Sequence, residues 1–275
     1  MKLKRVESLD RYKEISEIFR RKGCISNDYL QGDASGLIAE RHLFEYVEGD
    51  NAFLLVEKDE FFRLYYYLND LETVASFDNE NIVTEILFRG DLTTIASEVA
   101  YLERCGLERH LVRDQYFARY TDFVAVADFK STTSVEGIVV KEAGTLAEVQ
   151  WACELFNGVF DKWSGDFLPE SRYAALLQGR GILLATDPEG RLLGSLHQTR
   201  EKGMAWVSHV AVLAEARGRG VGKALLGSFI ERNHTDDKSR YMLWVQRQNE
   251  AAVRIYQQKG FKPMGKSSLS MLKLG

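Results

Sequence analysis

Cysteine and proline are scarce in this sequence of 275 residues, with three of each. The cysteines, Cys24, Cys105 and Cys153, are far apart and form no C-x-x-C pair, which argues against a disulfide framework and a thiolate zinc site. The five histidines are scattered, so we expect no metal site. With 45% hydrophobic and 28% charged residues, the composition excludes long disorder and collagen-like repeats. We expect a globular, cytoplasmic protein.

Long apolar runs and a strong charge of one sign are also lacking. No stretch approaches the roughly 20 consecutive apolar residues of a transmembrane helix, so we expect no membrane partner. The net charge of −4 is too small to indicate nucleic acid, but it is uneven. Residues 1–133 carry 17 basic and 25 acidic side chains, whereas residues 134–275 carry 19 and 15. The second half is therefore the better candidate for binding an anion.

The polar segment 131–134 predicts a boundary between a domain of residues 1–133 and a domain of residues 134–275. Residue spacing in the second half predicts strands at 137–141, 182–185, 192–199, 205–212 and 241–245, and helices at 145–160, 169–179, 222–232 and 251–259. In the first half it predicts helices at 9–19, 37–47 and 92–105, and strands at 53–57, 62–68 and 82–88. The similar order indicates an internal duplication.

The first copy of this duplication is expected to lack a ligand loop. Its helix at 92–105 is entered through Arg89-Gly90-Asp91, whereas the second copy has a glycine-rich turn between a strand and a helix. That turn consists of Arg217, Gly218, Arg219, Gly220, Val221, Gly222 and Lys223. Its glycines let backbone N–H groups approach an anion at the positive end of a helix. The three basic side chains add charge, so the turn predicts a pyrophosphate cradle.

Two better-known phosphate loops do not fit the spacing of this turn. A Walker A loop needs glycine where Arg217 stands and serine or threonine where Ala224 stands. The dinucleotide fingerprint G-x-G-x-x-G fails because Lys223 replaces its third glycine. A P-loop and a Rossmann site are therefore excluded.

Two blocks of the second half resemble the GNAT superfamily of acetyl-CoA-dependent N-acyltransferases. The first block, the signature loop, is Arg217, Gly220 and Gly222. The second block is Asn249, Ala252, Tyr256 and the Gly260-Phe261 pair. The resemblance covers residues 137–275 and implies an α/β fold with a mixed, mostly antiparallel sheet flanked by helices. The similar element order of the first half suggests a tandem protein with a degenerate first copy.

The resemblance also implies a reaction and a set of binding residues. Acetyl-CoA would be the cosubstrate, and its acetyl group would pass directly to a primary amine of a small molecule or peptide. The strand edge at Val210, Ala211 and Val212 would pair with the pantetheine arm, and the loop amides would hold the pyrophosphate. The N–H of Val210 or Val212 would stabilise the oxyanion. Asn249 would contact the pantetheine, and the small Ala252 would leave room for it.

Tyr256 is the candidate general acid, because a tyrosine hydroxyl can donate a proton to a departing thiolate. The general base stays open. Many family members have a glutamate where this chain has Ser208, which is a poor base. His209 beside it would point to the opposite face of the sheet unless a β-bulge re-aims it. Glu154 and His197 are weaker candidates, and a chain of water molecules would also serve.

The acceptor amine and the oligomeric state cannot be inferred from the sequence. The segment between Phe156 and Phe167, with Trp163 and Asp166, is expected to line the acceptor pocket, because loops carry specificity. The acidic first half would cover the acceptor side and favour a cationic amine. One alternative is a non-enzymatic CoA-binding regulatory module, for which Ser208 argues weakly and against which the glycine-rich loop and Tyr256 argue. Another is a tandem transferase that uses aminoacyl-tRNA, which would need a strongly basic surface.

Overall fold

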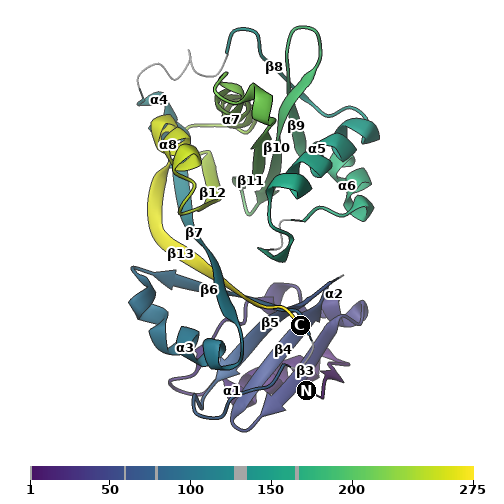
Figure 1. The fold of residues 1–275 in the computed structure, drawn as a ribbon, viewed down its shortest axis with the longest axis vertical. Coiled ribbons are helices and arrows are strands. Elements are labelled where there is room, and N and C mark those ends of the chain that lie inside the picture. The colour runs from purple at the N-terminus through teal and green to yellow at the C-terminus, as the bar shows by residue number, and fades with distance from the viewer. Residues whose placement is uncertain (1, 59, 78–79, 127–134, 165–166) are drawn as a thin grey trace. The chain divides into compact units, whose positions relative to one another are not determined.

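In the computed structural model, residues 2–58, 60–77, 80–126, 135–164 and 167–275 are described. The chain divides into two compact units. One contains Met1–Val112 and Lys266–Gly275, and the other is Arg113–Gly265. Each unit is a mostly antiparallel sheet flanked by helices, which confirms the predicted fold class (Figure 1). In the described part of the chain, no helix has the length and apolar character needed to cross a membrane.

The sheet of the first unit has the strand order β1-β3-β4-β5-β6-β13, with β2 paired to β5. Its strands are β1 (Lys4–Arg5), β2 (Ile25–Ser26), β3 (Leu43–Glu48), β4 (Asn51–Glu57), β5 (Phe62–Leu68), β6 (Ile82–Arg89) and β13 (Lys262–Lys273). Its helices are α1 (Leu9–Phe19), α2 (Ala34–Ala39) and α3 (Ala96–Arg104). Ser8 begins α1 by accepting a hydrogen bond from the N–H of Arg11 at 3.1 Å. The predicted helix at 9–19 is confirmed.

The helix expected at 37–47 is wrong. α2 ends at Ala39, Arg41 has a positive φ of 65°, and β3 then pairs antiparallel with β4. Apolar residues in so short a segment fit a helical and an alternating spacing equally well. Pairing with β4 decides between them, because it buries Leu43 completely and Tyr46 almost so.

The second unit has the strand order β7-β12-β11-β10-β9-β8. Its strands are β7 (Glu108–Arg119), β8 (Val139–Glu142), β9 (Ile182–Thr186), β10 (Leu192–Glu201), β11 (Met204–Val212) and β12 (Arg240–Gln246). Its helices are α4 (Tyr120–Val124), α5 (Leu146–Val159), α6 (Tyr173–Gln178), α7 (Val221–Arg232) and α8 (Glu250–Lys259). The strands and helices predicted for residues 134–275 are confirmed. The unit also contains β7 and α4, which precede residue 134 and were not predicted.

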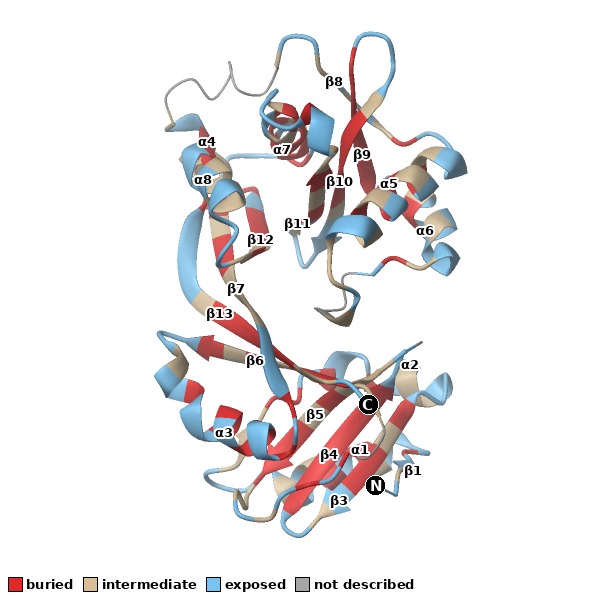
Figure 2. Cartoon of the chain, viewed as in Figure 1, coloured by how far each residue is buried: buried red, intermediate tan, exposed pale blue. Residues whose placement is uncertain are grey.

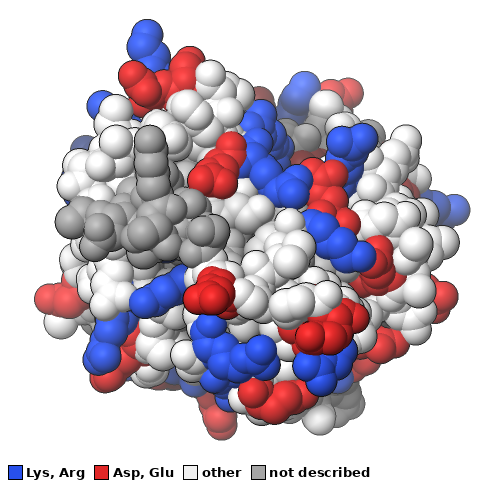
Figure 3. Space-filling model, turned by 90° about the horizontal axis from the view of Figure 1, so that it is seen from above, with Lys and Arg blue, Asp and Glu red and all other residues white. Residues whose placement is uncertain are grey.

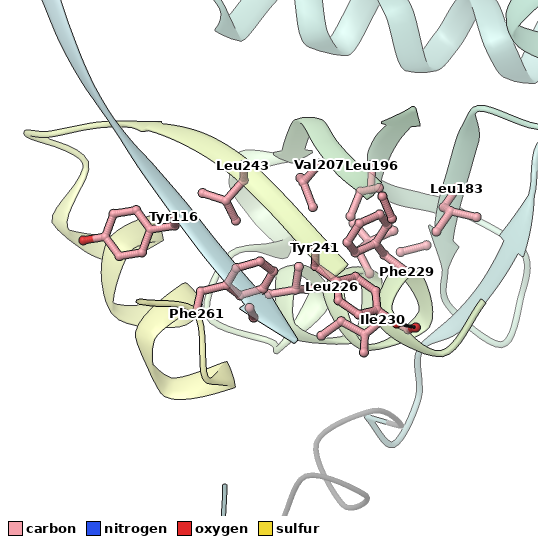
Figure 4. Packing of buried hydrophobic residues seen from close by; sticks show 14 of the residues in the cluster. Tyr116, Leu183, Leu196, Val207, Leu226, Phe229, Ile230, Tyr241, Leu243 and Phe261 are labelled. Carbon is pink, nitrogen blue, oxygen red and sulfur yellow. Dashed lines mark hydrogen bonds between the residues drawn. The ribbon is translucent and has the colours of Figure 1, made fainter. Parts of the chain in front are cut away.

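Two hydrophobic layers cover the sheet of the second unit. On one face, Leu226, Phe229 and Ile230 of α7 pack against strand residues that include Leu196 and Tyr241 (Figure 4). On the other face, α5 and α6 cover a cluster of their own, which contains Phe156 and Leu176. In Figure 2 the central strands β9 and β12 are largely buried, whereas the edge strand β8 and the outer sides of the helices are not. The sheet is therefore the rigid support on which any site of this unit is built.

The two units share one order of elements: a strand, two helices, three antiparallel strands, a parallel strand and a helix. β6 runs parallel to β5 as β12 runs parallel to β11, so α3 corresponds to α8. The comparison of Arg89-Gly90-Asp91 with the glycine-rich turn is therefore wrong. The counterpart of α7 would lie in residues 69–81, where the described residues form no helix.

Two strands are divided between the units. In β7, Arg113–Arg119 pair with β12, and in β13, Lys266–Lys273 pair with β6. Each unit thus includes a strand from the other half of the sequence. The boundary expected at 131–134 lies outside the described residues, and the division into domains 1–133 and 134–275 stays a prediction.

Candidate active site

β11 carries a β-bulge at Ser208. The strand pairs with β10, but His209 is opposite His197 while Val207 is opposite Gln198, so Ser208 is one residue in excess. Val207 packs in the cluster under α7. His209, two residues later, instead contacts the ring of Phe156 of α5 at 5.3 Å between centroids. The bulge therefore turns His209 to the opposite face, as bulges near functional sites often do.

β11 also separates from β12. Parallel pairing covers only Met204–Val207 with Arg240–Leu243, although β11 continues to Val212. Among the described strands, none pairs with this edge of β11 beyond Val207. The residues expected to bind pantetheine, Val210, Ala211 and Val212, lie in this segment. An extended ligand can add to such an edge as another strand would.

The glycine-rich turn leads into α7 with a left-handed backbone at Gly218 and Gly220, whose φ values are 76° and 86°. A Cβ at Gly220 would lie 3.0 Å from a methyl carbon of Val135, so both conformation and space favour glycine. The N-cap residue of α7, Gly220, has no side chain that could cap the helix, whereas Thr145 caps α5 and Asn249 caps α8. The first N–H groups of α7 therefore donate no hydrogen bond to an N-cap side chain and can bind an anion.

Residues of the second GNAT-like block define the two ends of α8. The side-chain oxygen of Asn249 accepts a hydrogen bond from the N–H of Ala252 at 3.1 Å, which begins the helix. Gly260 ends it with a φ of 106°, and a Cβ there would lie 2.8 Å from the carbonyl oxygen of Asp122. Phe261 is buried in the core. The spacing of this block thus reflects a helix with fixed ends.

A pocket of about 690 Å³ lies in the second unit beside the bulge. It brings together many of the predicted site residues: His197, Ser208, His209, Val210, Asn249, Ala252 and Tyr256. Among its described lining residues are also four that sequence reasoning missed: Arg113, Arg172, Trp206 and Trp244. Trp206 lies on a predicted strand, so alternation along that strand was a usable signal. Arg113 and Arg172 belong to no recognisable pattern.

Several predicted residues do not line this pocket. The described lining does not include Ala211, Val212, the residues 217–223, Glu154 or Trp163. Asp166 lies outside the described residues. The lining residues closest in sequence to Trp163 and Asp166 are Val159, Phe160 and Leu168. The end of α5 and the segment after it therefore contribute to the pocket wall.

Tyr256 lies half-buried in the pocket wall, with its ring edge-on to Phe261 at 5.9 Å between centroids. Burial raises the pKa of its hydroxyl to about 12. No hydrogen bond joins this hydroxyl to another described residue. At neutral pH it is therefore a protonated, available donor.

His197 and His209 form a buried pair, with their Nδ1 atoms 3.0 Å apart and their rings nearly parallel. Burial, then the charge of His209 and then that of Arg172 lower the pKa of His197 to about 3, so this ring is neutral at physiological pH. The Nε2 atom of His209 is shielded from solvent, and its ring packs against Phe156 and Phe160. Ser208, in contrast, is exposed, with its hydroxyl 3.4 Å from that of Thr199.

The surface charge is mixed on the face drawn in Figure 3. There, Lys and Arg side chains lie among Asp and Glu side chains, and neither sign forms a continuous stripe. A protein that binds the phosphates of an RNA backbone needs a continuous basic surface. This face therefore gives no support to a transferase that uses aminoacyl-tRNA.

One known protein family matches the second half of the chain. Residues 141–270 match the family described as "Acetyltransferase (GNAT) domain". A mycothiol acetyltransferase of Paenarthrobacter aurescens is 40% identical over 88 residues, or 30% of this chain and 27% of that protein. Another, from Mycobacterium avium, is 32% identical over 153 residues, or 48% of each protein. The chain therefore matches these curated relatives over about half of their length or less.

The fold of the chain resembles a solved structure described as a tandem GNAT protein from the clavulanic acid biosynthesis pathway. The TM-score is 0.54 at 14% identity, over 84% of this chain and 81% of the other. This likeness concerns the fold and agrees with a duplicated arrangement. Residues 141–270 therefore match a GNAT acetyltransferase domain, which confirms the resemblance found for the second half of the sequence.

Proposed function

We propose that the second unit binds acetyl-CoA and transfers its acetyl group directly to a primary amine. GNAT acetyltransferases in general use acetyl-CoA. The observation that carries the proposal is the edge of β11 beyond Val207, with which no described strand pairs, followed by the glycine-rich turn and by α7, whose N-cap residue is a glycine. An extended arm and a pyrophosphate require these two features in this order.

The residues of the second unit divide the binding between them. Val210, Ala211 and Val212 would pair with the pantetheine arm through their backbone. The first N–H groups of α7, with Arg217, Arg219 and Lys223, would hold the pyrophosphate. Asn249 uses its side-chain oxygen as a helix cap, so its amide NH₂ is the part left to contact the arm. Acetyl-CoA, when bound, supplies a thioester as the acetyl donor.

The chemical step then needs a proton donor and a proton acceptor. Tyr256 donates its proton to the departing thiolate, since its raised pKa keeps the hydroxyl protonated. The N–H of Val210 stabilises the oxyanion. His209 is shielded at Nε2 and Ser208 is a weak base, so we assign proton removal from the amine to pocket water.

Release of free CoA thiol from acetyl-CoA, measured with a panel of primary amines, tests this function. The panel should include the acceptor of mycothiol acetyltransferases, because the relatives carry that name. We expect thiol release that matches the amount of acetylated amine. Tight binding of acetyl-CoA without any amine-dependent release would contradict acetyl transfer and favour a CoA-binding regulatory module.

A further inference from the structure

The described lining of the pocket contains more basic than acidic side chains. Arg113 of β7 and Arg172, which precedes α6, both line it. Glu201 is the one acidic residue among the described lining residues. Its carboxylate is largely exposed and lies 3.2 Å from the ammonium of Lys202, which offsets its charge.

The backbone at Arg172 is held in place. Asn157 of α5 donates from its side chain to the carbonyl of Leu168 at 3.0 Å and accepts from the N–H of Leu168 at 2.9 Å. Pro169 follows in an extended conformation, and its carbonyl accepts the N–H of Arg172 at 3.0 Å. The guanidinium therefore extends from a fixed base, which reduces the entropy lost when it binds a ligand.

The guanidinium of Arg172 has no acidic partner among the described residues, although it is exposed at the pocket. Other arginines of this unit are paired: Arg232 with Glu142 at 2.9 Å and Arg247 with Asp114 at 2.7 Å. The charge of Arg172 acts on the pocket, since it contributes to the low pKa of the lining residue His197. A carboxylate or a phosphate matches such a guanidinium, because each accepts two parallel N–H bonds.

Two buried nitrogen atoms in the wall are compatible with the same ligand chemistry. The indole N–H of Trp206 is buried and meets no acceptor in the described part of the chain. Nε2 of His197, a side chain only 4% exposed, likewise lacks a partner there. Buried polar atoms of this kind are rare in proteins, and an oxygen-rich ligand is one way to satisfy them.

We propose that Arg172 binds an anionic group of the acetyl acceptor, so that the acceptor is an amine that also carries a carboxylate or a phosphate. This inference rests on the proposed acetyl transfer and names the class of its substrate. It differs from the cationic amine expected from the acidic first half, because the residues that line the pocket have the opposite balance.

Matched pairs of amines test the inference. One arm compares α-amino acids with the corresponding amino acid amides, and the other compares phosphoethanolamine with ethanolamine. In at least one arm we expect the anionic member to have a kcat/KM at least about tenfold higher, as for one charge-assisted contact. Equal kcat/KM for both members in both arms, or a preference for the neutral members, would overturn the inference. The arm with the larger ratio tells carboxylate from phosphate.

Variants of Arg172 connect this preference to the side chain. Arg172→Gln should raise the KM of the preferred anionic amine about tenfold or more, while the KM values of the neutral member and acetyl-CoA change less than about twofold. Arg172→Lys should keep much of the preference, since it keeps the charge. Arg254→Gln is the matched control, because Arg254 is exposed on α8 and outside the described lining. An equal effect of Arg172→Gln on both amines would contradict the assignment.

Calorimetry separates this inference from the proposed function. Titration of the free protein with the anionic and neutral amines measures binding without turnover. Selective binding of the anionic amine that is lost in Arg172→Gln supports the inference even where no acetyl transfer is detected. Acetyl transfer without such selectivity would instead support the function and refute the inference.

Discussion

At the scale of single residues, a substitution of Tyr256 tests the chemical step separately from the binding of acetyl-CoA. Tyr256→Phe removes the hydroxyl and keeps the ring packed against Phe261, so the fold and the affinity for acetyl-CoA should survive. We expect kcat to fall about a hundredfold, at the lower end of the range for general acid catalysis, because a CoA thiolate needs little help to leave. Since the pKa is about 12, this group should cause no loss of kcat between pH 6 and 10. A fall in kcat of less than about threefold would show that Tyr256 packs against its neighbours and is not the general acid.

His197 makes a second residue-scale prediction, about stability. A histidine in the unfolded chain has a pKa near 6.5, whereas burial lowers that of His197 to about 3. Between these values the unfolded chain binds more protons, so the free energy of unfolding falls as the pH is lowered. For one such group the slope reaches up to about 1.4 kcal/mol per pH unit.

Denaturant unfolding at several pH values between 4 and 7 measures this slope. His197→Asn keeps a polar atom near the position of Nδ1 and should flatten the dependence on pH. His42→Asn is the control, since its side chain is 47% exposed. A dependence that is the same in His197→Asn as in the parent would show that His197 does not titrate in this way.

At the scale of elements, the glycine-rich turn and α7 act together. Gly220→Asp would place a side chain against Val135 and a negative charge where the pyrophosphate is expected. We expect acetyl-CoA affinity to fall more than tenfold, or by more than about 1.4 kcal/mol. Gly190→Asp is a matched control, because Gly190 has a φ of 83° and open space in the turn between β9 and β10. Unchanged affinity in Gly220→Asp would contradict the cradle.

The elements that sequence could predict are those whose signals are local. α8 was predictable because its cap Asn249 and its stop Gly260 are marked by residue type. β3 was not, because only pairing with β4 decides the conformation of its short apolar run. The direction of His209 depended on a bulge, which the sequence allowed but did not require. Arg172 was missed because its place in the wall depends on a turn anchored by Asn157, eleven residues before Leu168.

At the scale of the whole molecule, the two units are unequal in their binding elements. The second unit has α7 with its glycine-rich turn, while no helix forms in the described part of residues 69–81 of the first. We therefore expect one acetyl-CoA per chain, measured by calorimetry on the full protein. Two equivalent sites per chain would refute the argument that the first copy lacks the ligand loop.

The division of β7 and β13 has a consequence for the order of events during synthesis. When the ribosome has released residues 1–112, the first unit still lacks Lys266–Lys273, which pair with β6 and are translated after the whole second unit. While residues 113–265 are being translated, the edge of β6 therefore has no partner from β13. An unpaired strand edge can pair wrongly with another nascent chain and cause aggregation. The second unit, Arg113–Gly265, is complete as soon as Gly265 has been translated, before the last strand of the first unit is available. The unit that is translated later can therefore finish folding first.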